Sequence, residues 1–168
     1  MQIKKILHIT GLRELGSGQR RQLQYEKNAS HKLNFVCWDT VAIHSGDPIE
    51  DFELTIPPYL NFLIIRNLYF WLYLLKERKK YDYILFRHIP FDPFSIFFSP
   101  FIKNRISVHH SKEVEELKLI KTGWKGRLAS NVEKITGKFS LQRSIFIAGV
   151  TQEIAIYENL RSNAHKGT

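Results

Sequence analysis

Short apolar runs alternate with longer segments of mixed polarity along the whole chain. Residues 4–10, KKILHIT, form the first run and end at a glycine-containing loop, which is typical of a buried parallel strand. By the same pattern, further strands are predicted at residues 32–40, 51–56, 81–89, 104–110 and 144–151. The segments between them predict helices at residues 17–31, 57–80, 92–103, 124–141 and 151–161.

This alternation of strands and helices predicts an α/β fold. Strand–helix–strand units with right-handed crossovers indicate a Rossmann-like, doubly wound, mainly parallel sheet with helices on both faces. The 168 residues fit a single domain, which we expect at residues 1–161. Residues 162–168 are expected to be a frayed tail or the start of a linker.

The fold predicts where ligands would bind. In an open doubly wound sheet they bind outside the carboxyl ends of the strands. The loops expected there are residues 11–18, 39–48, 87–92, 109–116 and 150–153.

The first of these loops, GLRELGSG, contains neither a G-x-G-x-x-G turn nor a P-loop. A phosphate could dock at the start of the following helix, where Ser17 is the predicted N-cap. Alternatively, the loop closes over an acceptor, or it is a plain flexible connection.

Two adjacent histidines end the predicted strand at residues 104–110. Neighbouring residues on a strand point to opposite faces, so either His109 or His110 could reach the cleft as a base or hydrogen-bond donor. The other reading is a structural role for both. Glu113 follows closely, but adjacent histidines do not easily share one ion, so no metal site is expected.

Two further polar residues follow apolar runs. Arg87 comes after YILF and could clamp a phosphate or carboxylate, or simply form a surface ion pair. Asp39 comes after FVCW and is either a site residue or a turn residue.

The formal net charge of +9, with a pI near 9.7, favours an anionic partner: nucleic acid, a phosphorylated ligand or an anionic membrane. We find no RNA-binding motif, helix-turn-helix or basic stripe, so nucleic acid is not expected. The single cysteine, Cys37, excludes a disulfide within the chain and fits a reducing compartment. No signal peptide is recognised, and a cytoplasmic location is expected.

The most hydrophobic stretch is PPYLNFLIIRNLYFWLYLL, residues 57–75. Asn61, Arg66 and Asn67 in its middle argue against a transmembrane span. The basic run KERKK follows directly. This segment is either packed in the core or lies on an anionic membrane, with aromatic side chains inserted and cations around them.

Several stretches, in this order, resemble the N-terminal domain of GT-B glycosyltransferases of family 4, the group 1 type. They are KKILHIT with its glycine-containing loop, YDYILFRH before a helix, RISVHHSKEVEE, RLASNVEKITGKFSLQRSI and FIAGVTQEIAIYENLR. RISVHHSKEVEE resembles the family's strand and histidine loop followed by acidic residues. FIAGVTQEIAIYENLR resembles its last N-domain strand, which ends in a Val-Ser or Val-Thr step before a helix.

This resemblance implies one half of a two-domain enzyme. The domain would bind the acceptor of a retaining glycosyltransferase that transfers a sugar to a polysaccharide or lipid-linked acceptor. The donor, a nucleotide-sugar, would be bound mainly by a C-terminal domain that is missing here. No cofactor and no metal are implied, and the isolated chain is expected to be inactive.

The resemblance also implies roles for particular residues. His109 or His110 would be the catalytic histidine at the cleft. Substrate or acceptor contacts would come from Gly16, Ser17, Gly18, Arg87 and Glu113. Thr151 and Glu153 would lie near the domain interface. Residues 57–80 would make a peripheral contact with the inner face of the cell membrane.

A second class of function stays open, a non-catalytic α/β module that binds a membrane or a partner protein. A response-regulator domain would need an acidic cluster after its first strand, but that strand ends in Ile9, Thr10 and Gly11.

Overall fold

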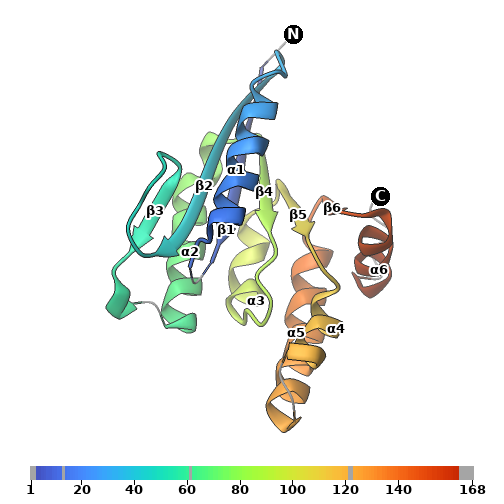
Figure 1. Cartoon of the computed structure of the whole chain (residues 1–168). Coiled ribbons are helices and arrows are strands. Elements are labelled where there is room, and N and C mark those ends of the chain that lie inside the picture. The colour runs from blue at the N-terminus through green and yellow to red at the C-terminus, as the bar shows by residue number, and fades with distance from the viewer. Residues whose placement is uncertain (1–2, 13, 61, 121–122, 163–168) are drawn as a thin grey trace. The chain divides into compact units, whose positions relative to one another are not determined.

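The computed structural model describes residues 3–12, 14–60, 62–120 and 123–162. The chain divides into two compact units, residues 1–86 and 87–168, and each is described by itself. Every strand lies in a parallel pair, and helices alternate with strands along the chain (Figure 1). The predicted α/β, Rossmann-like class is therefore confirmed.

The first unit has the strand order β3-β2-β1-β4. Its strands are β1 (Lys4–Gly11), β2 (Val36–Ser45), β3 (Glu53–Ile56) and β4 (Tyr83–Arg87). Its helices are α1 (Ser17–Ser30) and α2 (Leu63–Glu77), with 3₁₀ turns at Pro58–Leu60 and Arg78–Lys80.

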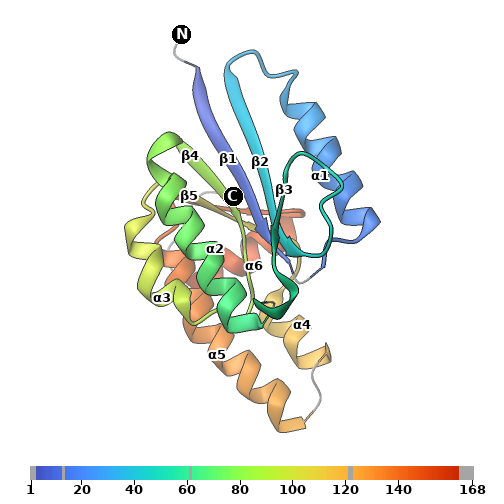
Figure 2. The same ribbon diagram turned by 90° about the vertical axis from the view of Figure 1, so that its left-hand side faces the viewer.

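Helices cover both faces of these strands, as predicted. α1 and α2 lie on opposite sides of the strands of the first unit (Figure 2). On one side Leu23 of α1 belongs to a buried cluster with Ala42 and Phe52. On the other, Phe70 and Trp71 of α2 pack on Phe86 of β4, with ring centroids 5.4 and 5.3 Å apart. Burying apolar area on both faces supplies most of the stability of such a sheet.

Two predicted elements in this unit have the wrong bounds, and the strand predicted at residues 32–40 starts only at Val36. β2 continues to Ser45, so the first part of the predicted loop 39–48 is strand. Asp39 therefore lies within the ladder, opposite Leu7, and its carboxylate accepts a hydrogen bond from the hydroxyl of Tyr81 at 2.9 Å. The predicted helix at 57–80 is broken, because Pro58 opens a 3₁₀ turn and α2 starts only at Leu63.

The second unit contains two parallel strands and four helices among its described residues. The strands are β5 (Arg105–His109) and β6 (Phe146–Gly149), with His109 opposite Gly149. The helices are α3 (Phe94–Phe98), α4 (Glu113–Ile120), α5 (Gly123–Gln142) and α6 (Gln152–Ser162), and a 3₁₀ turn spans Ser99–Phe101. α4 was not predicted, and the predicted tail at 162–168 lies outside the described residues except for Ser162, the end of α6.

Gly149 is required where β6 meets α6. A Cβ on Gly149 would lie 2.5 Å from the backbone nitrogen of Ala155 and 2.8 Å from the carbonyl oxygen of Thr151. Only glycine allows this close approach of strand and helix.

No described helix combines the length and apolar character needed to cross a membrane.

Candidate functional site

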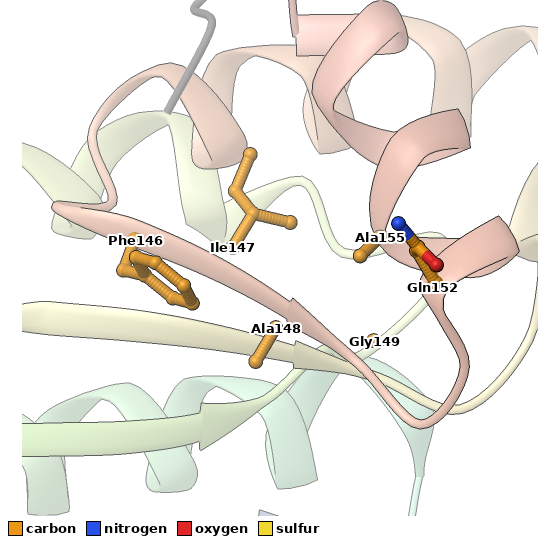
Figure 3. Close-up of a pocket in the computed structure, with 6 residues that line it drawn as sticks. All are labelled: Phe146, Ile147, Ala148, Gly149, Gln152 and Ala155. Carbon is orange, nitrogen blue, oxygen red and sulfur yellow. The ribbon is translucent and has the colours of Figure 1, made fainter. Parts of the chain in front are cut away.

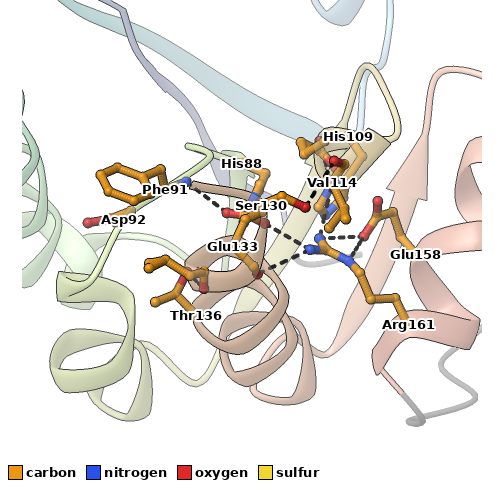
Figure 4. Close-up of polar contacts among 12 residues, drawn as sticks. His88, Phe91, Asp92, His109, Val114, Ser130, Glu133, Thr136, Glu158 and Arg161 are labelled. Atoms are coloured by element: carbon orange, nitrogen blue, oxygen red, sulfur yellow. Dashed lines mark hydrogen bonds and ion pairs between the residues drawn. The ribbon is translucent and has the colours of Figure 1, made fainter. Parts of the chain in front are cut away.

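Six ionisable side chains, five of them buried and one half-buried, form a cluster within the second unit (Figure 4). They come from the residue that follows β4, the end of β5, the first turn of α4, the middle of α5 and the end of α6: His88, His109, Glu113, Glu133, Glu158 and Arg161. Because ionisable groups are rarely buried without partners, their contacts decide what the cluster can do.

Glu133 is the central acceptor of the cluster. Its Oε1 contacts Nε2 of His88 at 2.8 Å and accepts from Nη1 of Arg161 at 2.8 Å. Its Oε2 accepts from the backbone N–H of Phe91 at 2.7 Å. Burial alone would raise the pKa of Glu133, but the charges of His88 and Arg161 and their hydrogen bonds lower it to about 2.

The guanidinium of Arg161 lies among three carboxylates. Besides Glu133, it donates from Nε to Oε2 of Glu158 at 2.5 Å, and its Nη2 lies 3.9 Å from Oε2 of Glu113. Burial would lower the pKa of Arg161, but Glu158, Glu133 and Glu113 outweigh burial and raise it. Arg161 is therefore the cation that allows these carboxylates to share one interior.

His109 is completely buried, and both of its ring nitrogens have partners. Nδ1 is 2.9 Å from Oε1 of Glu113, and Nε2 is 2.8 Å from Oγ of Ser107. Its ring also stacks on His88, with centroids 4.8 Å apart. Burial, together with the charges of His88 and Arg161, holds the pKa of His109 well below its usual value. A neutral ring can donate at one nitrogen and accept at the other.

The order Glu113–His109–Ser107 has the connectivity of a catalytic triad. However, Ser107 and His109 are both 0% exposed. A substrate cannot reach the Ser107 hydroxyl, so these three residues form a structural relay between β5 and α4.

The same side chains provide a donor set for a metal. One ligand atom each from His109, Glu113 and Glu158 lies within 4.8 Å of the others, and imidazole with carboxylates suits a divalent transition metal. Arg161 already supplies positive charge here, through its 2.5 Å contact with Glu158. A cationic side chain of the protein, Arg161, therefore already lies beside these ligand atoms.

Glu158 is the carboxyl most affected by burial. Burial raises its pKa to about 7, and neighbouring Glu113 adds to this rise, although Arg161 opposes it. A carboxyl that keeps its proton near neutral pH can act as a donor to a second carboxylate.

The structure brings together two of the predicted site residues, His109 and Glu113. His110, the next residue, is half-buried, whereas His109 is inaccessible. Arg87 is half-buried at the last position of β4 and takes part in a polar interaction.

Gly16, Ser17 and Gly18 are exposed and belong to the first unit. Ser17 is not the N-cap of α1, because Gly16 occupies that position with an extended backbone (φ −73°). The side-chain oxygen of Gln19 accepts from the Gly16 N–H at 3.0 Å instead. A Cβ on Gly18 would meet nothing within 4 Å, so the fold itself does not require glycine there.

Thr151 and Glu153 lie at the start of α6. The Thr151 hydroxyl accepts from the backbone N–H of Ile154 at 3.3 Å and caps the helix. Glu153 is exposed and pairs with Lys112. Both positions are accessible to a neighbouring domain.

Sequence reasoning missed Glu133, Glu158 and Arg161. One signal was present: α5 and α6 place these residues on faces that also carry buried small or apolar residues, such as Gly137 and Ala155. A charged residue on such a face indicates a buried partner.

A second polar cluster lies in the first unit. Arg20 of α1 forms a two-pronged ion pair with Glu53, at 2.7 Å from Nε to Oε1 and 3.1 Å from Nη2 to Oε2. Nε2 of His44 is 2.8 Å from the same carboxylate. These contacts join α1 to β2 and β3, so the role of Arg20 is structural.

An apolar pocket of about 270 Å³ lies beside β6 and the start of α6 (Figure 3). Its lining residues are Phe146, Ile147, Ala148, Gly149, Gln152 and Ala155. Gln152 is the lining residue with a polar side chain, so this pocket lacks the charges that a diphosphate would need.

No protein family model matches the chain, and no curated protein is significantly similar to it.

Proposed function

We propose that the chain is the N-terminal, acceptor-binding domain of a retaining glycosyltransferase. The enzyme would transfer a sugar from a nucleotide-sugar to a polysaccharide or lipid-linked acceptor. The Rossmann-like class and the histidine pair at the end of β5 support this proposal. The nucleotide-sugar would be held mainly by a second, C-terminal domain.

The observation that carries the proposal is the anchored turn between β5 and α4. The contact of His109 with Glu113 joins its two ends, and both side chains are buried in the cluster. The intervening residues, His110 among them, are therefore held on a rigid base at the carboxyl end of a parallel strand. Such preorganisation is what a site residue needs.

His110 is the member of the pair to which we assign the cleft role. It is half-buried, whereas His109 is completely buried and inaccessible to a sugar. In the proposal His110 hydrogen-bonds to the transferred sugar, and Arg87 contacts the acceptor or a phosphate. The resemblance also assigns a substrate contact to Gly16, Ser17 and Gly18, which are exposed in the first unit.

A lipid-linked acceptor would require access to a membrane. The segment at residues 57–80 exposes several large apolar side chains: Tyr59, Phe62, Ile64, Ile65, Tyr69 and Leu72. Its basic end is the 3₁₀ turn Arg78–Lys80. Apolar side chains beside cations are typical of peripheral binding, here to the inner face of the cell membrane.

The test is sugar transfer by the product of the complete gene, because the proposal places the donor in a second domain. Labelled nucleotide-sugars are offered with lipid-linked and polysaccharide acceptors. His110→Ala is expected to lower kcat by about 10²–10³-fold, the range for loss of a positioned hydrogen-bond donor. His31→Ala, at an exposed histidine of the first unit, is the matched control.

The outcomes separate the site from the function. Transfer that is unchanged in His110→Ala would refute the role of His110 but not the activity. Failure of the wild-type protein to transfer or bind any nucleotide-sugar would refute the function.

A non-catalytic binding module is the second candidate. The burial of His109 and Glu113 favours it, because such a cluster can be purely structural. In that case the product of the complete gene would bind a membrane or partner and would neither bind nor transfer a nucleotide-sugar.

A further inference from the structure

Helix α5 has its polar residues inside and its large apolar residues outside. Its buried positions include Ser130, Glu133, Thr136, Gly137 and Ser140. By contrast, Trp124, Leu128 and Ile135 are 70%, 52% and 66% exposed. At about 100° per residue these three side chains fall within about 40° of one another, so they form one stripe along the helix.

The buried face is fixed by the ion cluster. Glu133 bonds to His88 and Arg161. A Cβ on Gly137 would lie 2.1 Å from Oε1 of Glu133 and 2.6 Å from Nη1 of Arg161, so the missing side chain makes room for this ion pair. α5 cannot rotate to bury Trp124 without breaking the cluster, and its apolar stripe stays outside.

The exposed face of α5 carries positive charge only. Lys125, Arg127 and Lys134 are exposed beside the stripe, and Glu133, the helix's one acidic residue, is buried. Nζ of Lys125 lies 5.8 Å from the ring centroid of Trp124. Cations flanking an apolar stripe match a surface that is negative outside and apolar beneath.

The neighbouring helix also exposes a large apolar side chain. α4 lies beside α5 (Figure 1), and its Leu119 is 82% exposed. Of the exposed acids on α4, Glu115 pairs with Lys118 and Glu116 accepts from Ser111. Lys118 offsets the charge of Glu115, whereas the neutral Ser111 leaves Glu116 charged, so the three exposed cations of α5 still outnumber the unpaired acid nearby.

We propose that the outer face of α5 docks on an anionic lipid bilayer. Trp124, Leu128 and Ile135 insert at the level of the headgroups, and Lys125, Arg127 and Lys134 contact lipid phosphates. The 20-residue helix, about 30 Å long, lies along the membrane surface rather than across it. This inference does not depend on the glycosyltransferase proposal.

The first test is co-sedimentation of the full chain with vesicles of phosphatidylcholine, alone or mixed with phosphatidylglycerol. We expect binding to the mixed vesicles that falls at least 10-fold between low and high salt. The variant W124S/L128S/I135S is expected to bind at least 10-fold more weakly. K125E/R127E/K134E should lose binding similarly. These side chains are exposed, so circular dichroism should show unchanged folding.

The matched control is I64S/Y69S/L72S, which removes exposed apolar side chains from α2 instead. This variant should keep the part of the binding that α5 contributes. Any loss of binding that it shows measures the contribution of α2. Trp124 gives a direct readout: its fluorescence should shift to shorter wavelength on binding, and W124F should bind but lose this shift.

Several results would overturn the inference. They are equal binding to neutral and mixed vesicles, wild-type binding by the W124S/L128S/I135S variant, or no shift from Trp124. A stable dimer of the free chain that the same variant abolishes would mean that a second copy, not lipid, covers the stripe.

Discussion

At the residue scale, Gly137 shows how a missing side chain can be a functional part of a cluster. It sits in the middle of α5, where glycine costs about 1 kcal/mol relative to alanine. The space that it leaves is filled by Glu133 and Arg161. The stabilisation from the Glu133–Arg161 ion pair therefore outweighs the helix-propensity cost of glycine at this position.

We predict that Gly137→Ala destabilises the protein by about 1–3 kcal/mol, because the new methyl group must displace Glu133 or Arg161. Chemical denaturation measures the change. Gly18→Ala, in the first turn of α1 with no atom near the added Cβ, is the control and should be neutral or slightly stabilising. A gain in stability in both variants would show that the ion pair can move freely.

Glu158 should make stability depend on pH near neutrality. Its pKa is about 7 in the folded protein against about 4.5 unfolded, so the folded state holds the proton more tightly. This stabilisation is complete below about pH 4.5 and is lost as pH rises through about 7, with a total near 3 kcal/mol.

Glu158→Gln imitates the protonated form and cannot ionise. Its unfolding free energy should therefore fall less than that of the wild type between about pH 5 and about pH 8.5. Parallel pH profiles for the two proteins would contradict the raised pKa. Groups that do not interact with residue 158 contribute alike to both profiles, so the difference reports Glu158 and the groups coupled to it.

At the scale of elements, the position of a helix end was harder to predict than the helix itself. α1 starts at Ser17 as expected, yet the cap is Gly16, and Gln19 satisfies its N–H. α6 is capped by the hydroxyl of Thr151, a residue that the resemblance placed near a domain interface.

These two roles of Thr151 can be separated. Thr151→Ala should cost about 0.5–2 kcal/mol of stability, as for other lost N-caps, and Thr151→Ser should restore it. Thermal unfolding of both variants measures this. If Thr151 only caps α6, transfer by the complete enzyme should follow stability alone. A loss of transfer in the stable Ser variant would indicate an interface contact.

The elements also show where periodicity misleads. β2 continues through Thr40 and His44, two buried polar residues that interrupt its apolar pattern. α4 begins with acidic residues, which suit a helix N-terminus, but its eight residues are too short for a clear repeat. Tertiary contacts, such as those of His44 and Glu113 with their partners, stabilise both segments.

At the scale of the whole molecule, the chain is an α/β protein of Rossmann-like class with a basic surface. Its net charge of +9 lies mainly on exposed side chains. Several of its acidic residues, Glu53, Glu133 and Glu158 among them, form ion pairs in the interior. This distribution is consistent with an anionic partner, which both proposals share: a nucleotide-sugar or lipid phosphate in one, an anionic bilayer in the other.

The sequence by itself determined the class of fold and the approximate places of most strands and helices. It did so because apolar runs and helical periodicity reflect which faces are buried, and burial drives folding. It also placed His109, His110 and Glu113 together, because they are close in the chain at the end of one strand.

Only the tertiary structure decided which histidine is buried and what surrounds it. Glu133, Glu158 and Arg161 are far from His109 in sequence, and their meeting depends on the packing of α5 and α6. The exposure of the apolar stripe of α5 was also decided by tertiary packing. A helical pattern shows two faces, but the ion cluster on one of them determined that the polar face lies inside.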